Sequence, residues 1–122
     1  MVKSIIKIMV KKRMERLKIK ALSVNEAWKG KRYKTPLYKR YEADLGLLLP
    51  CVDVPEADKL QIHYIFGLSS KRADYDNCIK QFQDIISKKY NFNDNRIYKA
   101  IIEKVDVKKN EEFIKFKIEK YV

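Results

Sequence analysis

This sequence is poor in histidine, cysteine, glycine and proline. Each scarcity limits either the chemistry or the structure that the chain can have. Among 122 residues there are one histidine, two cysteines, three glycines and three prolines. Cys51 and Cys78 lack the spacing of a zinc site and are too few for a disulfide framework, so we expect core or surface thiols. The single histidine, His63, lies in a strand-like run, which excludes most chemistry that uses histidine as the general base. Few glycines and prolines predict mostly regular structure with short loops.

Long apolar runs are also absent. No stretch approaches the ~20 apolar residues of a membrane-spanning helix, and the short apolar start of the chain is not followed by a cleavage-site pattern. We therefore expect a cytoplasmic protein with no membrane partner. A hydrophobic content of 46% is enough for a globular core, so residues 1–122 are predicted to form a single domain.

Acidic residues are scarce in the first third of the chain. The first 41 residues carry 14 lysines and arginines and only two acids, whereas the remainder carries 14 of each. A positive surface of this kind attracts polyanions through steering and counterion release. Residues 28–41, WKGKRYKTPLYKRY, also interleave rings with cations. Because rings stack on bases while cations meet phosphates, this favours a nucleic-acid partner over a merely soluble lysine-rich protein.

Hydrophobic patterns predict an α+β fold with one small mixed or antiparallel sheet and two main helices packed on it. Residues 23–34 interrupt these patterns and are predicted to be an exposed, DNA-contacting loop, with a solvated connector as the alternative. Strand-like patterns cover residues 3–10, 17–22, 59–68, 97–109 and 111–122. The last two are expected to form a hairpin about Asn110.

Two helices are predicted from capping signals and apolar stripes. Thr35 and Pro36 begin the first helix as N-cap and first helical residue, and Pro50 ends it. The second helix begins near Asp76. The expected buried stripes are Tyr38, Tyr41, Leu45 and Leu48 in the first helix, and Ile79, Phe82, Ile85 and Ile86 in the second.

Three aspartates surround the second predicted helix. Asp74 and Asp76 are two residues apart, so in an extended segment they share a face, and Asp94 follows a helix-length insert. Grouped carboxylates repel one another but supply the oxygen ligands that Mg²⁺ prefers. The sequence therefore predicts a magnesium site, with Mn²⁺ able to substitute. Lys80, one turn beyond Asp76, is expected on the same side, where its charge would reduce the repulsion.

Two structural alternatives apply to these acids. Asp76 can be explained as a helix N-cap alone, although a cap leaves the other two aspartates unexplained. Asp84, two turns along the same helix from Asp76, is interpreted as a solvated or salt-bridged surface acid in preference to an additional metal ligand.

Three short motifs follow one another in the chain. Ser23-Val24-Asn25 and Trp28 precede a basic loop, the pattern D-x-D-N-x-x-K covers residues 74–80, and Asn93-Asp94-Asn95 precedes a predicted strand. This order resembles the RusA family of Holliday junction resolvases over roughly residues 18–107. Residues 1–17 have no counterpart in the resemblance and are interpreted as a basic N-terminal extension.

The resemblance implies roles for individual residues. The catalytic, metal-binding carboxylates fall on Asp74, Asp76 and Asp94, and the essential lysine falls on Lys80. Asn77 would orient a carboxylate or contact a phosphate. The paired acids that the family usually carries before its last strands appear here as Asn93-Asp94, so the first acid is replaced.

The activity implied is Mg²⁺-dependent resolution of four-way DNA junctions by paired symmetric nicks, in recombination and repair. Family membership would also imply a homodimer, acting in a bacterial or phage-infected cell. Two alternatives stay open: a basic nucleic-acid-binding module without catalysis, and a metal-dependent nuclease acting on flaps or ordinary duplex. The predicted DNA-binding residues are Lys29, Lys31, Arg32, Lys34, Lys39, Arg40, Lys71 and Arg72.

Overall fold

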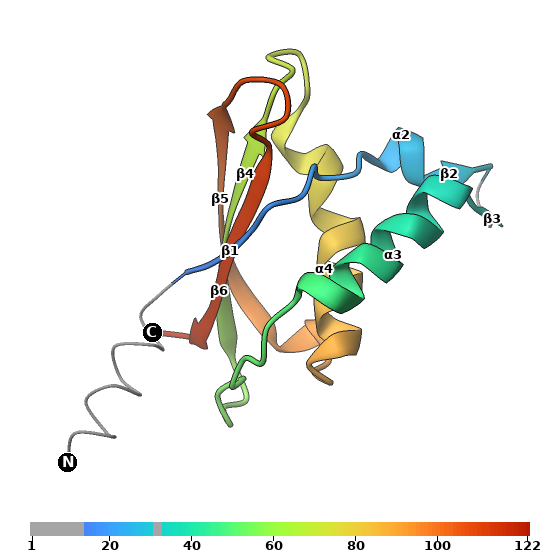
Figure 1. Ribbon diagram of the computed structural model, residues 1–122. Helices are drawn as coiled ribbons and strands as arrows, with labels where there is room; N and C mark the ends of the chain where they lie inside the picture. The colour runs from blue at the N-terminus through green and yellow to red at the C-terminus, as the bar shows by residue number, and fades with distance from the viewer. Residues whose placement is uncertain (1–13, 31–32) are drawn as a thin grey trace.

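The computed structural model describes residues 14–30 and 33–122, and in this part of the chain one mixed sheet carries helices on one of its faces (Figure 1). The described strands of this sheet have the order β1-β6-β4-β5. They are β1 (Glu15–Leu17), β4 (Leu60–Leu68), β5 (Ile97–Asp106) and β6 (Phe113–Lys120). The predicted α+β class is confirmed. The strand expected at residues 3–10 lies outside the described residues.

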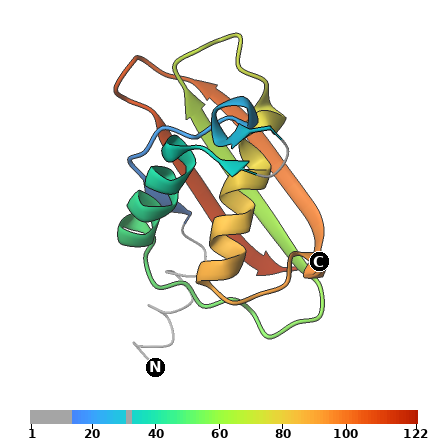
Figure 2. The same ribbon diagram turned by 90° about the vertical axis from the view of Figure 1, so that its right-hand side faces the viewer.

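The remaining elements lie to the helical side of the sheet, and Figure 2 shows α3 and α4 in front of the strands. They are α2 (Val24–Ala27), the short hairpin of β2 (Trp28–Lys29) and β3 (Tyr33–Lys34), α3 (Pro36–Leu48), the 3₁₀ turn η1 (Tyr75–Cys78), α4 (Ile79–Lys89) and the 3₁₀ turn η2 (Asp94–Arg96). None of the described helices combines the length and the hydropathy that a membrane crossing requires.

The core forms where β4 faces α4. As the alternation of the sequence predicts, one face of β4 is buried, and its side chains are Leu60, Ile62, Tyr64 and Phe66. Phe82 of α4 places its ring edge-on to Tyr64 and to Phe116 of β6, at centroid distances of 6.0 and 5.4 Å. Full burial of each such side chain stabilises the fold by about 1.5–3 kcal/mol.

The predicted hairpin between the last two strands is wrong. β5 pairs with β4 in parallel, and β6 pairs with the other edge of β4 in antiparallel orientation, so β4 separates them. The reason is that α4 carries the chain back along the sheet, and such a crossover makes the next strand parallel. β6 then occupies the opposite edge of β4, and β5 is the last of the described strands, with most of its residues exposed.

The structure also corrects the prediction for the segment before α3. The strand expected at residues 17–22 is instead β1, which pairs with β6, so residues 15–17 belong to the sheet. The predicted loop over residues 23–34 contains α2, begun by a capping box in which Ser23 Oγ accepts a hydrogen bond from Glu26 N–H. Ala27 is fully buried. The S-x-x-E spacing carried this signal.

The first main helix begins as predicted and differs at its end. Thr35 Oγ1 accepts a hydrogen bond from the backbone N–H of Tyr38 at 3.2 Å, and Pro36 is the first helical residue. Leu48, predicted to be buried, is 43% exposed, because Leu49 takes the buried position at the helix end. The other predicted stripe residues of α3 are buried.

The second main helix begins later than predicted. The turn η1 covers residues 75–78 and α4 starts at Ile79, so Asp76 is not the N-cap of the helix. Phe82 and Ile86 are fully buried as expected, whereas Ile79 and Ile85 are half-buried.

Gly67 of β4 lies in close contact with Phe113 on the face of the sheet that the helices do not cover. A methyl group at this position would overlap the ring of Phe113, its partner on β6. Phe113 is only 8% exposed, and the Arg16 guanidinium lies 4.4 Å from its ring centroid. We predict that Gly67→Ala lowers the free energy of unfolding by about 1–3 kcal/mol, measured by urea denaturation.

The matched control is Gly46→Ala on the exposed face of α3. A methyl group there meets nothing within 4 Å. This change should raise the free energy of unfolding by about 0.5–1 kcal/mol, because alanine favours the helix over glycine. Equal stability of Gly67→Ala and the parent protein would contradict the packing described for Phe113.

Candidate active site

The first pair of predicted site residues lies at the start of η1, after β4 and its connecting loop, with Asp74 as the N-cap residue and Asp76 inside the turn. Asp74 and Asp76 are both exposed, and the Asp74 side chain makes no capping hydrogen bond. Lys104 of β5 holds the loop, since its Nζ donates to the backbone oxygens of Lys71 at 2.9 Å and Ala73 at 2.7 Å. The two carboxylates are therefore presented to solvent from a backbone that is tied to the sheet.

The third aspartate lies on η2, after α4. Asn91 adopts a left-handed φ of 54°. Asn93 Oδ1 accepts a hydrogen bond from Asn95 N–H at 3.0 Å, which forms an Asx turn around Asp94. Asparagine favours both the left-handed backbone and the Asx turn, so the asparagine-rich sequence explains this geometry.

Arg96, the last residue of η2, fixes this turn against the acidic loop of residues 51–58. Its Nη2 donates to the backbone oxygen of Pro55 at 2.9 Å, and its Nε donates to that of Ala57 at 3.1 Å. A guanidinium that binds two carbonyl groups restrains both segments. Asp94 is thus presented from an anchored turn.

Lys80 connects α4 to the turn that carries Asp94. Its Nζ lies 2.8 Å from Asp84 Oδ1 and 3.4 Å from Asp94 Oδ2. The hydrogen bond with Asp84 raises the pKa of Lys80, burial acts in the opposite direction, and Asp94 adds to the increase. The ammonium group therefore stays charged at neutral pH. Asp84 is a salt-bridged surface acid, as predicted.

The three aspartates do not form the cluster expected from the sequence. Among the described residues, no group of three histidine, cysteine, aspartate or glutamate side chains is placed to hold a metal ion. Lys80 was expected beside Asp76, but its ion pairs within residues 14–30 and 33–122 are with Asp84 and Asp94. Carboxylates repel one another, and Asp94 gains a cation by pairing with Lys80. Carboxylate oxygens are suitable ligands for Mg²⁺, but in this arrangement the carboxylates of the three aspartates do not lie together.

Gln81 joins the basic N-terminal segment to η1. It is 1% exposed, and its Nε2 donates to the backbone oxygens of Leu22 at 2.9 Å and Asn77 at 2.6 Å. A buried amide is costly unless it is hydrogen-bonded, so this contact fixes the two segments relative to each other. Asn77, predicted to orient a carboxylate or contact a phosphate, contributes its backbone here.

Histidine and cysteine chemistry is not supported at this site. Cys78 is buried, and burial, with smaller contributions from Glu26 and Asp76, raises its pKa to about 11. A neutral thiol is a poor nucleophile and metal ligand. Cys51 is exposed, so the prediction of core or surface thiols is confirmed. His63 lies on β4, as its strand-like run predicts, and its Nε2 lies 2.7 Å from Glu103 Oε1.

The predicted DNA-binding residues are exposed wherever the structure describes them. Lys34 lies 2.9 Å from Glu42, with its Nζ 5.0 Å from the centroid of the Tyr38 ring. Lys31 and Arg32 lie outside the described residues. The exposed residues come from β2, β3, α3 and the loop before η1, and are Lys29, Lys34, Lys39, Arg40, Lys71 and Arg72.

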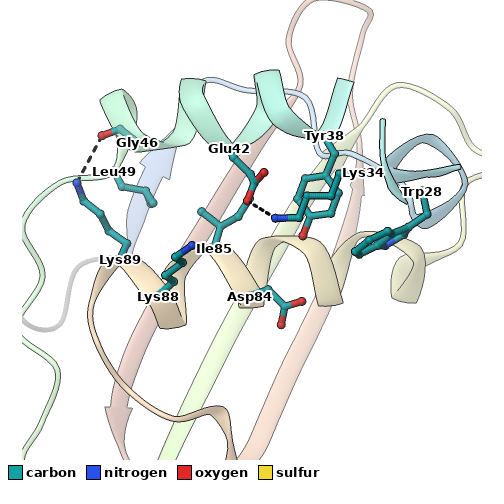
Figure 3. Close-up of a pocket in the computed structure, with 10 residues that line it drawn as sticks. All are labelled: Trp28, Lys34, Tyr38, Glu42, Gly46, Leu49, Asp84, Ile85, Lys88 and Lys89. Atoms are coloured by element: carbon teal, nitrogen blue, oxygen red, sulfur yellow. Dashed lines mark hydrogen bonds and ion pairs between the residues drawn. The ribbon is translucent and has the colours of Figure 1, made fainter. Parts of the chain in front are cut away.

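A groove of about 350 Å³ runs between α3 and α4, with Trp28 at one end and Lys89 at the other (Figure 3). Asp84 lines it, so the groove adjoins Lys80. The motifs did not reveal this groove. The signal available was the spacing of Lys80, Asp84 and Lys88, which are four residues apart and lie along one helix face. The lining residues are Trp28, Lys34, Tyr38, Glu42, Gly46, Leu49, Asp84, Ile85, Lys88 and Lys89.

Comparison with protein-family models gave no match for this chain, and comparison with curated proteins gave no significant relative. The similarity to the RusA family therefore rests on the motifs quoted above.

Lys80 should be dispensable for folding. Its side chain is 66% exposed, and exposed ion pairs contribute about 0–1 kcal/mol. We predict that Lys80→Ala changes the free energy of unfolding at neutral pH by less than about 1 kcal/mol in urea denaturation. Because the pKa of Lys80 is raised, any contribution is fully present at neutral pH and is lost only as the pH rises beyond the ordinary lysine value of about 10.4.

The control for this prediction is Lys117→Ala, which removes a comparable surface pair with Glu119 at 3.2 Å. The two variants should unfold at similar urea concentrations. A loss of several kcal/mol in Lys80→Ala alone would contradict the surface character of its ion pairs.

Proposed function

We propose that this protein is a structure-selective endodeoxyribonuclease that resolves four-way DNA junctions. The observation that carries the proposal is the contact between Lys80 and Asp94, which joins two residues of the motif from separate segments. It lies beside a groove lined by aromatic and basic side chains. The motif order and the positive charge of the first third of the chain support the same activity.

The residues of this chain have defined tasks in the proposed reaction. In phosphodiester hydrolysis, water loses a proton and forms a bond to phosphorus, the bond to the 3′ oxygen breaks and that oxygen takes up a proton, and negative charge grows on the phosphate oxygens. The Lys80 ammonium stabilises that charge, exchanging its contact with Asp94 for one with the phosphate. Lys71 and Arg72 are exposed beside η1 and bind phosphates of the DNA backbone. Such contacts position the DNA but give no sequence specificity.

Mg²⁺, with Mn²⁺ as a substitute, is the cofactor that the motif implies. Asp74, Asp76 and Asp94 have suitable oxygen ligands, and such a metal supplies an activated water and neutralises phosphate charge. Within the described residues the three carboxylates are not gathered around one point.

A homodimer is part of the proposal. A four-way junction has two-fold symmetry, and paired symmetric nicks require two identical sites. A two-fold dimer supplies them, whereas a monomer would leave single nicks. Such an activity would be needed in the cytoplasm of a bacterial or phage-infected cell.

A second candidate function, which the exposed cations alone would support, is a basic module that binds nucleic acid without cutting it. One experiment separates the candidates. Labelled four-way junctions, flaps and linear duplexes are each incubated with the protein in Mg²⁺ or in EDTA. Paired symmetric nicks in the junction alone, and only with Mg²⁺, support the proposed resolvase. Cutting of flaps or duplex shows another nuclease, and binding without cutting shows the second candidate.

The first prediction of the proposal concerns Asp74. We expect Asp74→Asn to bind the junction as the parent protein does, because the exposed cations hold the DNA. Its Mg²⁺-dependent cleavage should fall by at least the roughly 10–100-fold seen when residues around a metal ligand are changed. The control is Asp106→Asn, which changes an exposed acid at the end of β5. Full cleavage by Asp74→Asn would refute the assignment of this carboxylate.

The second prediction concerns Lys80. Lys80→Ala should slow cleavage by about 10²–10³-fold, as expected when charge stabilisation in the transition state is removed. Binding of the junction, measured by fluorescence anisotropy, should weaken less than about tenfold, because one phosphate contact among several is lost. Equal losses in cleavage and in binding would instead make Lys80 a DNA-anchoring residue.

A further inference from the structure

The groove between α3 and α4 is the right size for a single small group. Its volume of about 350 Å³ lies near the lower limit of ligand sites, which span roughly 300–1,000 Å³. Figure 3 shows Trp28 and Tyr38 gathered at one end and Lys88 projecting from α4 further along. One end of the groove is thus aromatic, and the rest carries charge.

The aromatic end combines a supported ring with an accessible one. Tyr38 is 2% exposed and meets Trp28 edge-on, with ring centroids 5.4 Å apart and an interplanar angle of 86°. Trp28 itself is half-buried, so part of its indole remains open. An indole held in place by a neighbouring ring is a stacking platform that any base can use.

The charges in the groove leave a positive surplus. Its two acids already have lysine partners, since Glu42 lies 2.9 Å from Lys34, and Asp84 lies 2.8 Å from Lys80. Lys89 Nζ donates a hydrogen bond to the backbone oxygen of Gly46. This acceptor is uncharged, so the contact does not neutralise the positive charge of Lys89. Lys88 has no ion-pair partner within the described part of the chain. The surplus favours an anionic ligand.

The hydroxyl of Tyr38 adds a neutral donor at neutral pH. Burial, followed by the nearby charges of Asp84 and Glu42, raises the pKa of Tyr38 to about 12. The phenol therefore stays protonated and can donate a hydrogen bond to a phosphate or to a base edge.

The groove is continuous with the candidate active site. Asp84 lines the groove and also holds Lys80, whose Nζ lies 3.4 Å from Asp94. If one phosphate of a DNA strand contacts Lys80, the neighbouring nucleotide of that DNA strand can therefore lie in the groove.

We propose that this groove is a subsite for one unpaired nucleotide of the DNA substrate. The base stacks on Trp28 and the phosphate pairs with Lys88. The identity of the substrate rests on the proposed function. The chemistry recognised is a free base attached to a phosphate, which a fully paired duplex does not present and which an opened branch point does.

Trp28 is the only tryptophan of the chain, so its fluorescence reports directly on the groove. The protein is titrated with a short oligothymidine and with an abasic oligonucleotide of the same length. Oligothymidine should quench Trp28, because its bases stack, whereas the abasic strand should not. Lys88→Ala should weaken oligothymidine binding by roughly three- to tenfold, as expected for one lost phosphate contact.

The control is Lys99→Ala, an exposed lysine of β5, and it should bind as the parent protein does. Three results would overturn the subsite: no quenching by oligothymidine, equal quenching by the abasic strand, or equal weakening in Lys88→Ala and Lys99→Ala.

The junction assay separates this proposal from the proposed function. Junction cleavage without quenching of Trp28 by oligothymidine overturns the subsite and leaves the nuclease standing. Quenching that is weakened in Lys88→Ala, in a protein that cuts no DNA, supports the nucleotide subsite and overturns the nuclease.

Discussion

Burial of one face of β4 against α4 is the constraint on which the rest of the structure depends. Leu60, Ile62, Tyr64 and Phe66 are 0–1% exposed, and the Phe82 ring of α4 packs edge-on against Tyr64 and Phe66. Because α4 must lie across this strand, the chain returns along the sheet and β5 enters parallel to β4. The loop that carries Asp74 and Asp76 therefore precedes the helix, and the turn that carries Asp94 follows it.

Gln81 extends this constraint to the basic part of the chain. A buried amide that lost its acceptors would cost about 1–3 kcal/mol, so the carbonyl groups of Leu22 and Asn77 stay together. One consequence is that Trp28, close to Leu22 in the chain, lies beside α4 at the mouth of the groove. Gln81 thus links the basic part of the candidate site to the turn that follows Asp74.

Local signals were enough to predict much of this fold. The alternation in β4 and the Thr35-Pro36 cap each describe a residue and its near neighbours, and both are confirmed. The hairpin failed because strand patterns do not say which edge of β4 each strand takes. In the candidate site, the pairing of Asp84 followed from the sequence. The pairing of Lys80 with Asp94 did not, because it depends on how far η2 folds back along α4.

The terminal position of β5 has a consequence for how molecules of this protein meet. Within residues 14–30 and 33–122, no strand pairs with the outer edge of this ten-residue strand, and open edges of this kind offer backbone groups to other extended chains and promote aggregation. Here Lys99, Glu103, Lys104 and Asp106 place charges along the strand, and most of its residues are exposed. Indiscriminate strand addition is discouraged by the cost of burying those charges. A chain that did add there would have to match their order, so this edge selects for a specific neighbour.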